Sequence, residues 1–315
     1  MKERNIAGFA EYNIPFKDFR ARAGIRYEHV ISDYYSNDFL QSDPCRKYSD
    51  WFPSLSLSWS KGKWQAQIGY NAKMLRPSYR NLSSWMQYDN RYEYQGGNPL
   101  LKPAQVHTVE MTATRTWLTF TLGYKNTKNQ VAYVMHPYEG NIFIKTYENI
   151  DKIQSLYASL TASPRFGIYQ PMYEANISKQ FLEDNIYGIG VSLGHPRISF
   201  RMNNRFAITK DFTVSVNLSY NSSYASTISV YKEGGSLDVN VYKSFFNNKL
   251  VFHIWGRDLL QTQKMRYTMY SINSMFSTKQ DIDSRCFSIG LQYNFNASKS
   301  KYKGTGAGNS EKGRM

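Results

Sequence analysis

One stretch of the sequence has the spacing of a nucleophilic serine motif, G-x-S-x-G, at residues 190–194. A nucleophile elbow holds its serine on a sharp turn between a strand and a helix. Here His195 and Pro196 follow the motif directly, and an alternating, strand-like run follows them. Because the helix that the elbow needs is not indicated, we do not expect Ser192 to act as a nucleophile.

Metal and phosphate chemistry have no better support in the sequence. The two cysteines, Cys45 and Cys286, are far apart and lack C-x-x-C spacing, which argues against a zinc site and leaves open whether they pair. The glycines at 304–308 lack the G-K-[ST] of a phosphate loop. The sequence also has no H-E-x-x-H motif. Its five histidines are scattered, at His29, His107, His136, His195 and His253. We therefore predict no catalytic residue, no metal and no cofactor.

Arginines recur at alternating positions in two strand-like runs. Successive side chains of a strand point to opposite faces, so each set would project from one face. If that face lines the lumen of a barrel, the arginines would attract anionic ligands or pair with acidic residues that enter the lumen. We favour the pairing, as the simpler of the two roles. The sets are Arg20, Arg22 and Arg26, and Arg197, Arg201 and Arg205.

Aromatic residues crowd the segment 75–104, between two strand-like runs. Aromatic faces suit sugars or aryl ligands at the mouth of a binding site, whereas packing within the loop is the alternative interpretation. Three prolines here cannot donate to a sheet ladder, and the glycine pair at 96–97 permits positive φ, so the loop should be structured. The candidate ligand contacts are Tyr79, Trp85, Tyr88, Tyr92 and Tyr94.

The element that would position these residues is the β-strand. Leu55, Leu57 and Trp59 alternate with serines, and a turn at 61–63 leads into a second alternating run. Similar runs recur as far as residue 295, and no segment has a helical period. We predict about thirteen antiparallel strands, most of them near the 9–11 residues that cross a bilayer at a tilt.

The composition fits a membrane barrel. The 315 residues include 26 Tyr, 18 Phe and 6 Trp, and the mean hydropathy is −0.57. Each strand of a membrane barrel has a polar and an apolar face, and the mean hydropathy averages over both. A negative mean hydropathy therefore does not exclude a membrane protein. The net charge of +15 is spread along the chain, whereas a nucleic-acid-binding protein should cluster its basic residues on one face.

Short and long connections alternate between the predicted strands, as they do in outer-membrane barrels. Short turns near 15–17, 61–63, 115–116, 209–211 and 247–248 alternate with longer links at 32–50, 75–104, 223–234 and 258–283. Short periplasmic turns and long outer loops explain this asymmetry, with exceptions at 136–141 and 163–171. Aromatic residues beside the short turns predict a girdle at the inner membrane interface. They are Trp59, Trp64, Trp117, Phe212, Phe245, Phe246 and Phe295.

These patterns predict an all-β, antiparallel up-and-down transmembrane β-barrel, present in part, over residues 1–296. A flexible, basic, glycine-bearing periplasmic tail would follow at 297–315. The chain opens in a strand-like run at Ile6–Ile14 without an apolar signal segment. Thirteen is also an odd number, whereas single-chain bacterial barrels are even. We therefore expect the C-terminal part of a larger barrel.

Three motifs now resemble a known family. They are R-P-S-Y at Arg76–Tyr79, G-N-P-L-L-K-P at Gly97–Pro103, and a terminal strand that begins D-S-R-C-F at Asp283–Phe287. Together they resemble the C-terminal half of TonB-dependent receptors of the outer membrane protein β-barrel family, over essentially the whole chain. The resemblance implies a receptor in the bacterial outer membrane that imports a scarce, bulky ligand, such as a siderophore or a glycan, and is not an enzyme.

The resemblance also implies partners. Receptors of this kind have about 22 strands, a plug domain inside the barrel, and an N-terminal segment that contacts the energy-transducing TonB complex. We expect the plug and the remaining strands to be missing here, and outer-membrane lipid to surround the wall. Two alternatives stay open: a soluble secreted β-protein that binds or cleaves polysaccharide, which as an enzyme should show paired carboxylates in a cleft, and a non-energised porin or adhesion barrel.

Overall fold

The computed structural model describes residues 1–36, 38–182, 193–271 and 274–295. Throughout this part the regular structure is β-sheet, as predicted. Within the same ranges, no helix has the length and apolar character needed to cross a membrane. The tail predicted at 297–315 lies outside the described residues.

One long sheet dominates the molecule. Its main path is antiparallel, with neighbouring strands paired in the order β1-β2-β3-β4-β7-β8-β9-β10-β11-β12-β15-β16-β19. This path contains thirteen strands, which confirms the predicted number, and β5 with β6 brings the sheet to fifteen. The strands of the path are β1 (Lys2–Phe16), β2 (Phe19–Ser36), β3 (Phe39–Lys61), β4 (Trp64–Leu75), β7 (Ala104–Arg115), β8 (Leu118–Pro137), β9 (Phe143–Ala162), β10 (Tyr169–Phe181), β11 (Arg197–Thr209), β12 (Phe212–Asn221), β15 (Gly234–Phe245), β16 (Leu250–Arg257) and β19 (Cys286–Tyr293).

Several strands are longer than the predicted 9–11 residues. β3 has 23 residues, and β8 and β9 have 20 each. Pairing continues past the length needed to cross a bilayer, because opposite residues keep exchanging hydrogen bonds up to the hairpin ends. The predicted link at 32–50 is accordingly wrong, since Ser36 pairs with Phe39 and nearly all of that segment is strand.

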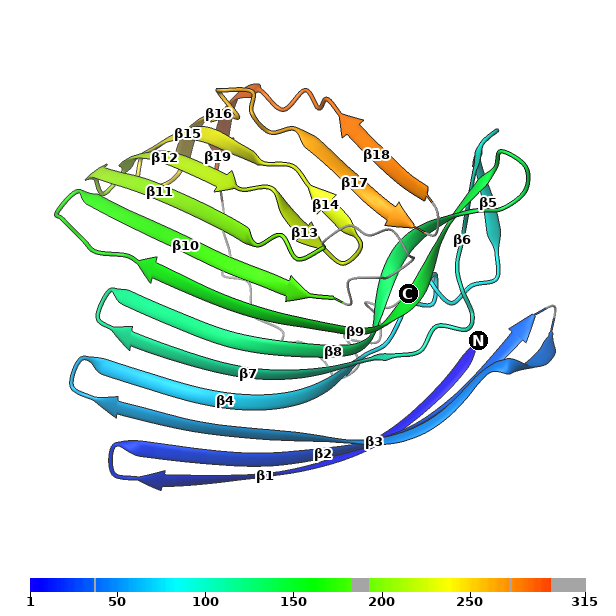
Figure 1. Ribbon diagram of the computed structural model, residues 1–315. Helices are drawn as coiled ribbons and strands as arrows, with labels where there is room; N and C mark the ends of the chain where they lie inside the picture. Colours follow the sequence, from blue (N-terminus) through cyan, green and yellow to red (C-terminus); the bar gives the residue numbers. More distant parts are fainter. Residues whose placement is uncertain (37, 183–192, 272–273, 296–315) are drawn as a thin grey trace.

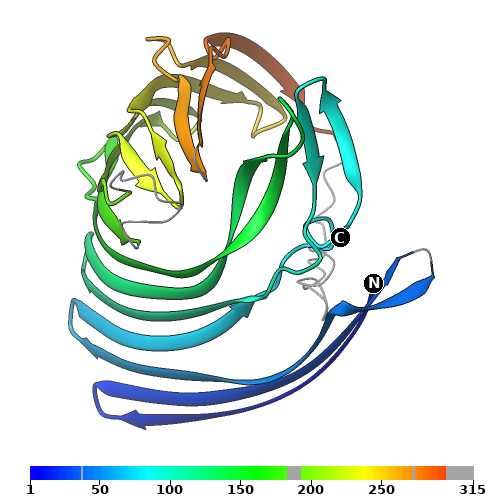
Figure 2. The ribbon, with the colours of Figure 1, turned by 45° about the vertical axis from the view of Figure 1, so that its right-hand side comes forward.

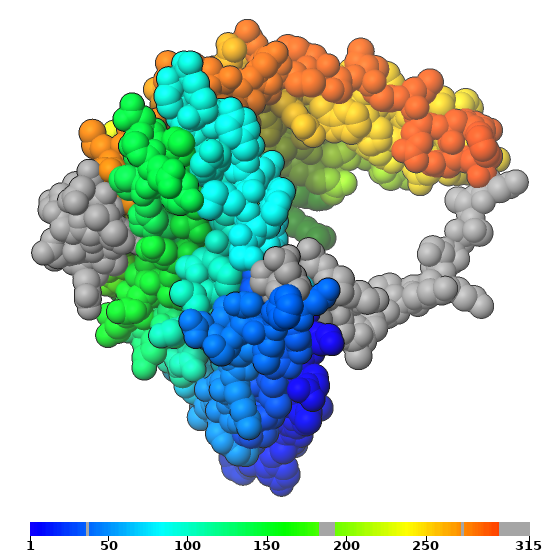
Figure 3. Space-filling model, turned by 90° about the vertical axis from the view of Figure 1, so that its right-hand side faces the viewer, coloured from blue at the N-terminus to red at the C-terminus, as the bar shows by residue number. Residues whose placement is uncertain are grey.

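The sheet curves into an open wall. Figures 1 and 2 show the strands following one another around a hollow, with β1 at one edge and β19 at the other. Within the described strands, β1 pairs with β2 and β19 pairs with β16, so these two edges do not meet. In the space-filling view of Figure 3 the hollow is visible between the N-terminal strands and the segment around β17–β19.

The two rims of the wall differ as predicted. Six connections at one rim are turns of a few residues, at 17–18, 62–63, 116–117, 163–168, 210–211 and 246–249. Lys17, Gly62 and Thr116 have φ angles of 49°, 59° and 51°, the left-handed conformation that tight hairpin turns require. At the other rim, three of the four predicted long links contain short strands of their own. These strands are β5 (Met86–Asn90), β6 (Glu93–Gly96), β13 (Tyr224–Ser226), β14 (Ser229–Tyr231), β17 (Met265–Ser271) and β18 (Ser274–Gln280).

Four of the short strands form a second sheet, in the order β13-β14-β17-β18. This sheet packs on the outer-rim ends of β8 and β9, and a buried apolar cluster lies between them. Val134 of β8, Ile228 and Met269 meet there, with Val134 and Ile228 almost completely buried. The core of this molecule therefore lies above the wall, at the rim that carries the long links.

The convex face of the wall is apolar and uncovered. Leu55, Ile68 and Leu291 are 54%, 49% and 71% exposed, and Val216 is half-buried. Cross-strand partners on this face are apolar too, as in the row Leu57↔Ile68↔Met111. No second layer of the described chain covers these side chains, which is the pattern of a lipid-facing barrel surface.

Aromatic residues mark both edges of this apolar band. Of the predicted inner girdle, Trp64, Trp117, Phe245, Phe246 and Phe295 are exposed, whereas Trp59 and Phe212 are half-buried. A second aromatic band, which the sequence analysis did not predict, lies farther along the strands. It contains Tyr27 and Trp51, whose ring centroids are 4.7 Å apart, and the exposed Tyr124 and Tyr220. Amphipathic rings favour both interfaces of a bilayer, so two bands are the expected arrangement.

Candidate functional site

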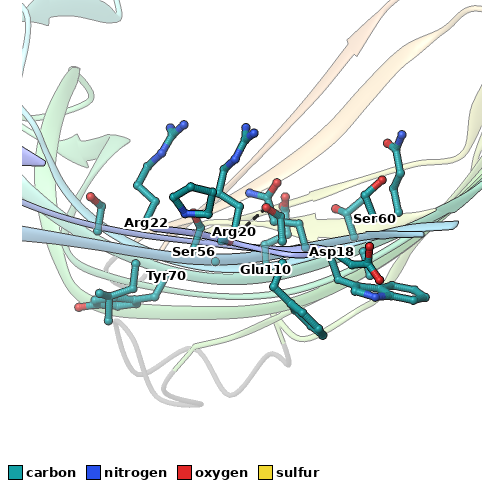
Figure 4. Close-up of a pocket in the computed structure, with 18 of the residues that line it drawn as sticks. Asp18, Arg20, Arg22, Ser56, Ser60, Tyr70 and Glu110 are labelled. Atoms are coloured by element: carbon teal, nitrogen blue, oxygen red, sulfur yellow. Dashed lines mark hydrogen bonds between the residues drawn. The ribbon is translucent and has the colours of Figure 1, made fainter. Parts of the chain in front are cut away.

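The concave face of β1–β4 and β7 forms a polar trough of about 850 Å³ near the short-turn rim. Arg20 and Arg22 project into it from β2, and Figure 4 shows both on one side of the strands while Tyr70 lies on the other. The register explains this, because Arg20 pairs with Ser58 and Arg22 with Ser56, so arginine and serine share the inner face. Arg20 and Arg22 thus lie on the concave face of the wall.

Most of the predicted lumen arginines already have partners on the wall. Arg22 lies 3.5 Å from Glu11, Arg26 2.6 Å from Glu28, and Arg201 3.2 Å from Glu174. Arg205 donates to Gln170 at 2.7 Å, and Arg197 donates to Asn221 at 2.7 Å. Within the described part of the chain, the Arg20 guanidinium alone among the six lacks such a partner.

A buried ion pair fixes the start of the link 76–103 to the wall. Arg76 pairs with Glu28 of β2, and both side chains are about nine-tenths buried. Arg76 also donates through Nε to the Tyr48 hydroxyl at 3.0 Å, while Arg26 holds the other oxygen of Glu28. A charge withdrawn from water requires partners of this kind. Arg76, which the sequence analysis quoted only as part of a motif, thus joins three elements.

The end of the same link is fixed by two asparagines. Asn98 donates through Nδ2 to the Tyr147 carbonyl at 2.9 Å. Asn149 of β9 accepts from the Lys102 amide at 2.8 Å and donates to the Lys102 carbonyl at 2.9 Å. A Cβ on Gly97 would lie only 2.4 Å from the Ser83 carbonyl oxygen, so this position requires glycine. The predicted structured loop is confirmed, and its motif serves to attach the link to β9.

The predicted aromatic cluster lies on and beside the β5–β6 hairpin of this link. Tyr88 and Tyr94 pair across the hairpin with ring centroids 6.0 Å apart, and Tyr94 meets Tyr138 of the next outer link at 5.9 Å. Trp85 is exposed, and the Arg91 guanidinium lies 4.6 Å from the exposed ring of Tyr92. Tyr79 is half-buried in the preceding turn. The structure thus brings Tyr88 and Tyr94 together and leaves Trp85, Tyr88 and Tyr92 open to solvent.

An ion-pair cluster docks the hairpin onto β9. β6 pairs with β9 in parallel, and Lys145 of β9 reaches back to Glu93 at 2.7 Å and to Asp89 at 3.4 Å. The hydrogen bond from Lys145 lowers the pKa of Glu93, against a smaller opposing effect of partial burial. Lys145 was not predicted, because it lies 52 positions from Glu93 and carries no local signal.

The motifs that the sequence analysis set aside are described only in part. Residues 190–192 of the G-x-S-x-G stretch lie outside the described residues. Cys45 and Cys286 are separate free thiols, which settles their pairing. No cluster of three potential metal ligands occurs among the described residues. His136 does contact Glu148 at 2.7 Å and Ser271 at 3.1 Å, but Ser271 is completely buried, so no substrate can reach its hydroxyl.

Comparisons with known proteins agree with this architecture. A model described as the outer membrane protein beta-barrel family matches residues 1–293. No match was found among curated proteins. Similar solved structures include the ferric-catecholate import receptor Fiu of E. coli K12, with a TM-score of 0.62, 13% identity, and coverage of 93% of this chain and 45% of that one.

Two further solved structures have the same relation to the chain. For the siderophore receptor PirA of Acinetobacter baumannii the TM-score is 0.57 at 14% identity, with 93% of this chain and 46% of that chain covered. For a variant of the ferric enterobactin receptor PfeA of Pseudomonas aeruginosa the TM-score is 0.53 at 15% identity, with 83% of this chain and 40% of that chain covered. Identities this low establish the fold alone, and the chain spans less than half of each of these three receptors.

The open antiparallel wall, its apolar convex face, its unequal rims and the family match over residues 1–293 converge on one assignment. They confirm the resemblance from which the sequence analysis drew its expectations of fold and location. The chain belongs to the outer membrane protein β-barrel family and forms part of a barrel wall in the bacterial outer membrane.

Proposed function

We propose that the chain is the C-terminal part of the barrel of a TonB-dependent receptor, which imports a bulky, scarce ligand such as a siderophore or a glycan and is not an enzyme. The observation that carries the proposal is the combination of a charged inner trough with a rim of structured outer links. The similar solved structures are receptors for ferric catecholates, ferric enterobactin and siderophores, which favours an iron-chelate ligand here.

In this proposal the outer hairpin captures the ligand. Trp85, Tyr88 and Tyr92 are exposed on the β5–β6 hairpin, and flat aromatic faces suit aryl or sugar groups. Tyr79 and Tyr94 would support these side chains from below. Because Lys145 and β9 fix the hairpin, capture would need little ordering of the loop, which reduces the entropic cost of binding.

The inner trough would receive a plug domain that is not part of this chain. Arg20 supports this role, since its guanidinium faces the lumen without a partner among the described residues. An acidic plug residue would pair with it. The other predicted arginines, whose charges or hydrogen bonds are already satisfied on the wall, would then serve mainly to keep the lumen polar. We also retain the proposal that residues 297–315 form a flexible periplasmic tail after the barrel.

The test is uptake by the whole gene product in a strain that lacks other receptors. Radiolabelled ferric siderophores of the catecholate and hydroxamate classes, and a labelled oligosaccharide, are supplied with and without the proton-motive force. We expect accumulation of one class that stops when the force is collapsed or TonB is removed. Uptake that continues without energy would replace this proposal with a porin, and release of cleaved sugar would replace it with an enzyme.

A double substitution isolates the role of the hairpin. Trp85→Ala with Tyr88→Ala removes two exposed rings without touching the ion pairs of Lys145, so the barrel should fold normally on an unheated gel. Binding of the imported ligand should weaken by about tenfold or more, at roughly 1 kcal/mol for each ring that no longer stacks on the ligand. Phe246→Ala, an equally exposed ring at the short-turn rim, is the matched control and should leave binding unchanged.

A further inference from the structure

Three lysines lie on the convex face of three adjacent strands. Lys128 and Lys152 are register partners, whereas Lys179 pairs with Leu156, four residues nearer the short-turn rim than Lys152. Lys128 is ten residues from the start of β8 (118 to 128), Lys152 is ten from the end of β9 (162 to 152), and Lys179 is ten from the start of β10 (169 to 179). All three side chains are exposed. Ten residues of a strand tilted by about 40° climb roughly 25 Å, which is the height of the apolar band of an outer-membrane barrel.

The register shows that this face is the one that meets lipid. Lys128 lies two and four residues beyond Asn126 and Tyr124, and alternate residues of a strand share a face. Tyr124 pairs with Leu156 and Val109, which are exposed apolar residues of the convex side. Lys128 and Lys152 therefore lie where the apolar band ends and the outer headgroup layer begins.

Two of the three ammonium groups stand directly opposite each other. Lys128 of β8 and Lys152 of β9 are register partners, so their Cβ atoms are about 5 Å apart. Like charges in this position repel and destabilise the strand pair. In water the two opposed charges do not stabilise the sheet. An anion placed between the two ammonium groups would be attracted by both and would offset their repulsion.

The convex face offers no carboxylate at this level to neutralise them. The outward positions beside the lysines are Gln105, His107, Asn126 and Gln154 on β7, β8 and β9, and Phe181 on β10. Among the described residues none of the three lysines takes part in a salt bridge, and Lys179 rests 5.4 Å from the ring of Phe181. Three uncompensated positive charges thus face the outer leaflet.

We propose that Lys128 and Lys152 bind the phosphate group of a lipid headgroup in the outer leaflet, while Lys179, which lies one strand along and nearer the short-turn rim, adds to the positive potential around them. The acyl chains of that lipid would lie along the apolar residues below, such as Leu156 and Ile177, while the phosphate accepts from the ammonium groups. This site lies on the outside of the wall and is independent of the ligand that passes through the lumen.

The test uses the whole protein that carries this chain, purified in an uncharged detergent. Native mass spectrometry measures its apparent affinity for dioleoylphosphatidylglycerol and for dioleoylglycerol, which has the same acyl chains without phosphate. Wild type should retain only the phospholipid. Lys128→Gln with Lys152→Gln should weaken that binding about twentyfold, at roughly fivefold per surface lysine, whereas Lys128→Arg with Lys152→Arg should retain it.

The matched control is Lys125→Gln. Lys125 is exposed on the same strand but has the opposite parity, with Thr108 and Ser155 as its register partners, so its loss should leave lipid binding within twofold. Equal weakening by Lys125→Gln, or no weakening by the double glutamine variant, overturns the proposal. Displacement of the lipid by millimolar inorganic phosphate would overturn it in favour of a site for a free anion.

A second readout is the melting temperature, measured first without and then with the lipid. In phosphate-free neutral detergent, Lys152→Gln removes the repulsion between the two opposed lysines and should raise the melting temperature of the protein. Added phosphatidylglycerol should then stabilise the wild type more than the variant. A variant that melts lower than the wild type in both conditions would show that these lysines serve only the fold, and would overturn the proposal.

Discussion

The link 76–103 and the second sheet both stand above the same rim, yet different forces hold them. The link is fixed at its two ends by polar groups: the pair of Arg76 with Glu28, and the hydrogen bonds of Asn98 and Asn149. The second sheet is held by an apolar core around Val134 and Ile228. Polar attachments have strict geometry and fix one position, whereas apolar packing tolerates substitutions of similar volume. This difference explains why the link carries recognisable motifs and the second sheet carries none.

The largest effect should come from breaking the buried attachment of the link. Arg76→Gln leaves Glu28 buried with a single charged partner, and local stability of the link should fall by about 3–4 kcal/mol. Hydrogen exchange of the amides at 81–83 and 98–101 measures the loss. Arg26→Gln removes the more exposed partner of the same carboxylate and should cost less than about 1 kcal/mol. Equal losses would mean that burial of the pair is not what matters.

The corresponding substitution in the second sheet should lower stability nearly as much, but its effect on amide exchange should appear in a different region. Ile228→Ala removes a side chain that is 1% exposed, and the smaller buried apolar surface together with the resulting cavity should cost about 3 kcal/mol. Exchange should increase across β13, β14 and β17 and leave the link 76–103 unchanged. Ile228→Val is the matched control at about 1 kcal/mol. Faster exchange in the link as well would show that the two regions unfold as one unit.

A smaller effect is expected at the glycine of the link. Gly97→Ala places a methyl group against the carbonyl oxygens of Ser83 and Asn81, and the backbone must shift at a cost of about 2 kcal/mol. Gly8→Ala is the control, because a Cβ at Gly8 meets nothing within 4 Å. Limited proteolysis of the folded barrel should cut the Gly97 variant within the link and spare the control. Resistance of both variants would refute the close-approach role of Gly97.

The smallest predicted effect is a response to acid. The pKa of Glu93 is lowered by Lys145, so the attraction that docks the hairpin is present above the pKa of an unfolded glutamate, about 4.3. It is lost as the pH falls through the lower folded value, because protonation neutralises the carboxylate. The change should stay below about 1 kcal/mol, since the pair is partly exposed. Protection factors of the β5–β6 amides, which correct for the intrinsic pH dependence of exchange, should fall below pH 4 in the wild type and change less in Glu93→Gln.

Much of the wall could be predicted from the sequence. Alternation around Leu55, Leu57 and Trp59 assigned the convex and concave faces correctly, and Arg20 and Arg22, on the opposite parity, lie on the concave face. The prediction of thirteen strands and the difference between the rims were also confirmed. The length of the strands was underestimated at 32–50, because nothing in that polar segment signals that β2 and β3 continue to pair beyond the membrane.

Local patterns determined the faces, because side-chain direction in a strand repeats every two residues whatever the strand pairs with. Only the tertiary structure decided which distant residues meet. Glu28 and Arg76 are 48 positions apart, and Lys102 and Asn149 are 47 apart. The second sheet joins segments near 224–231 and 265–280, and the opposition of Lys128 and Lys152 follows from strand register alone. Such contacts depend on how the whole sheet curves and aligns its strands, and no short window of sequence contains that information.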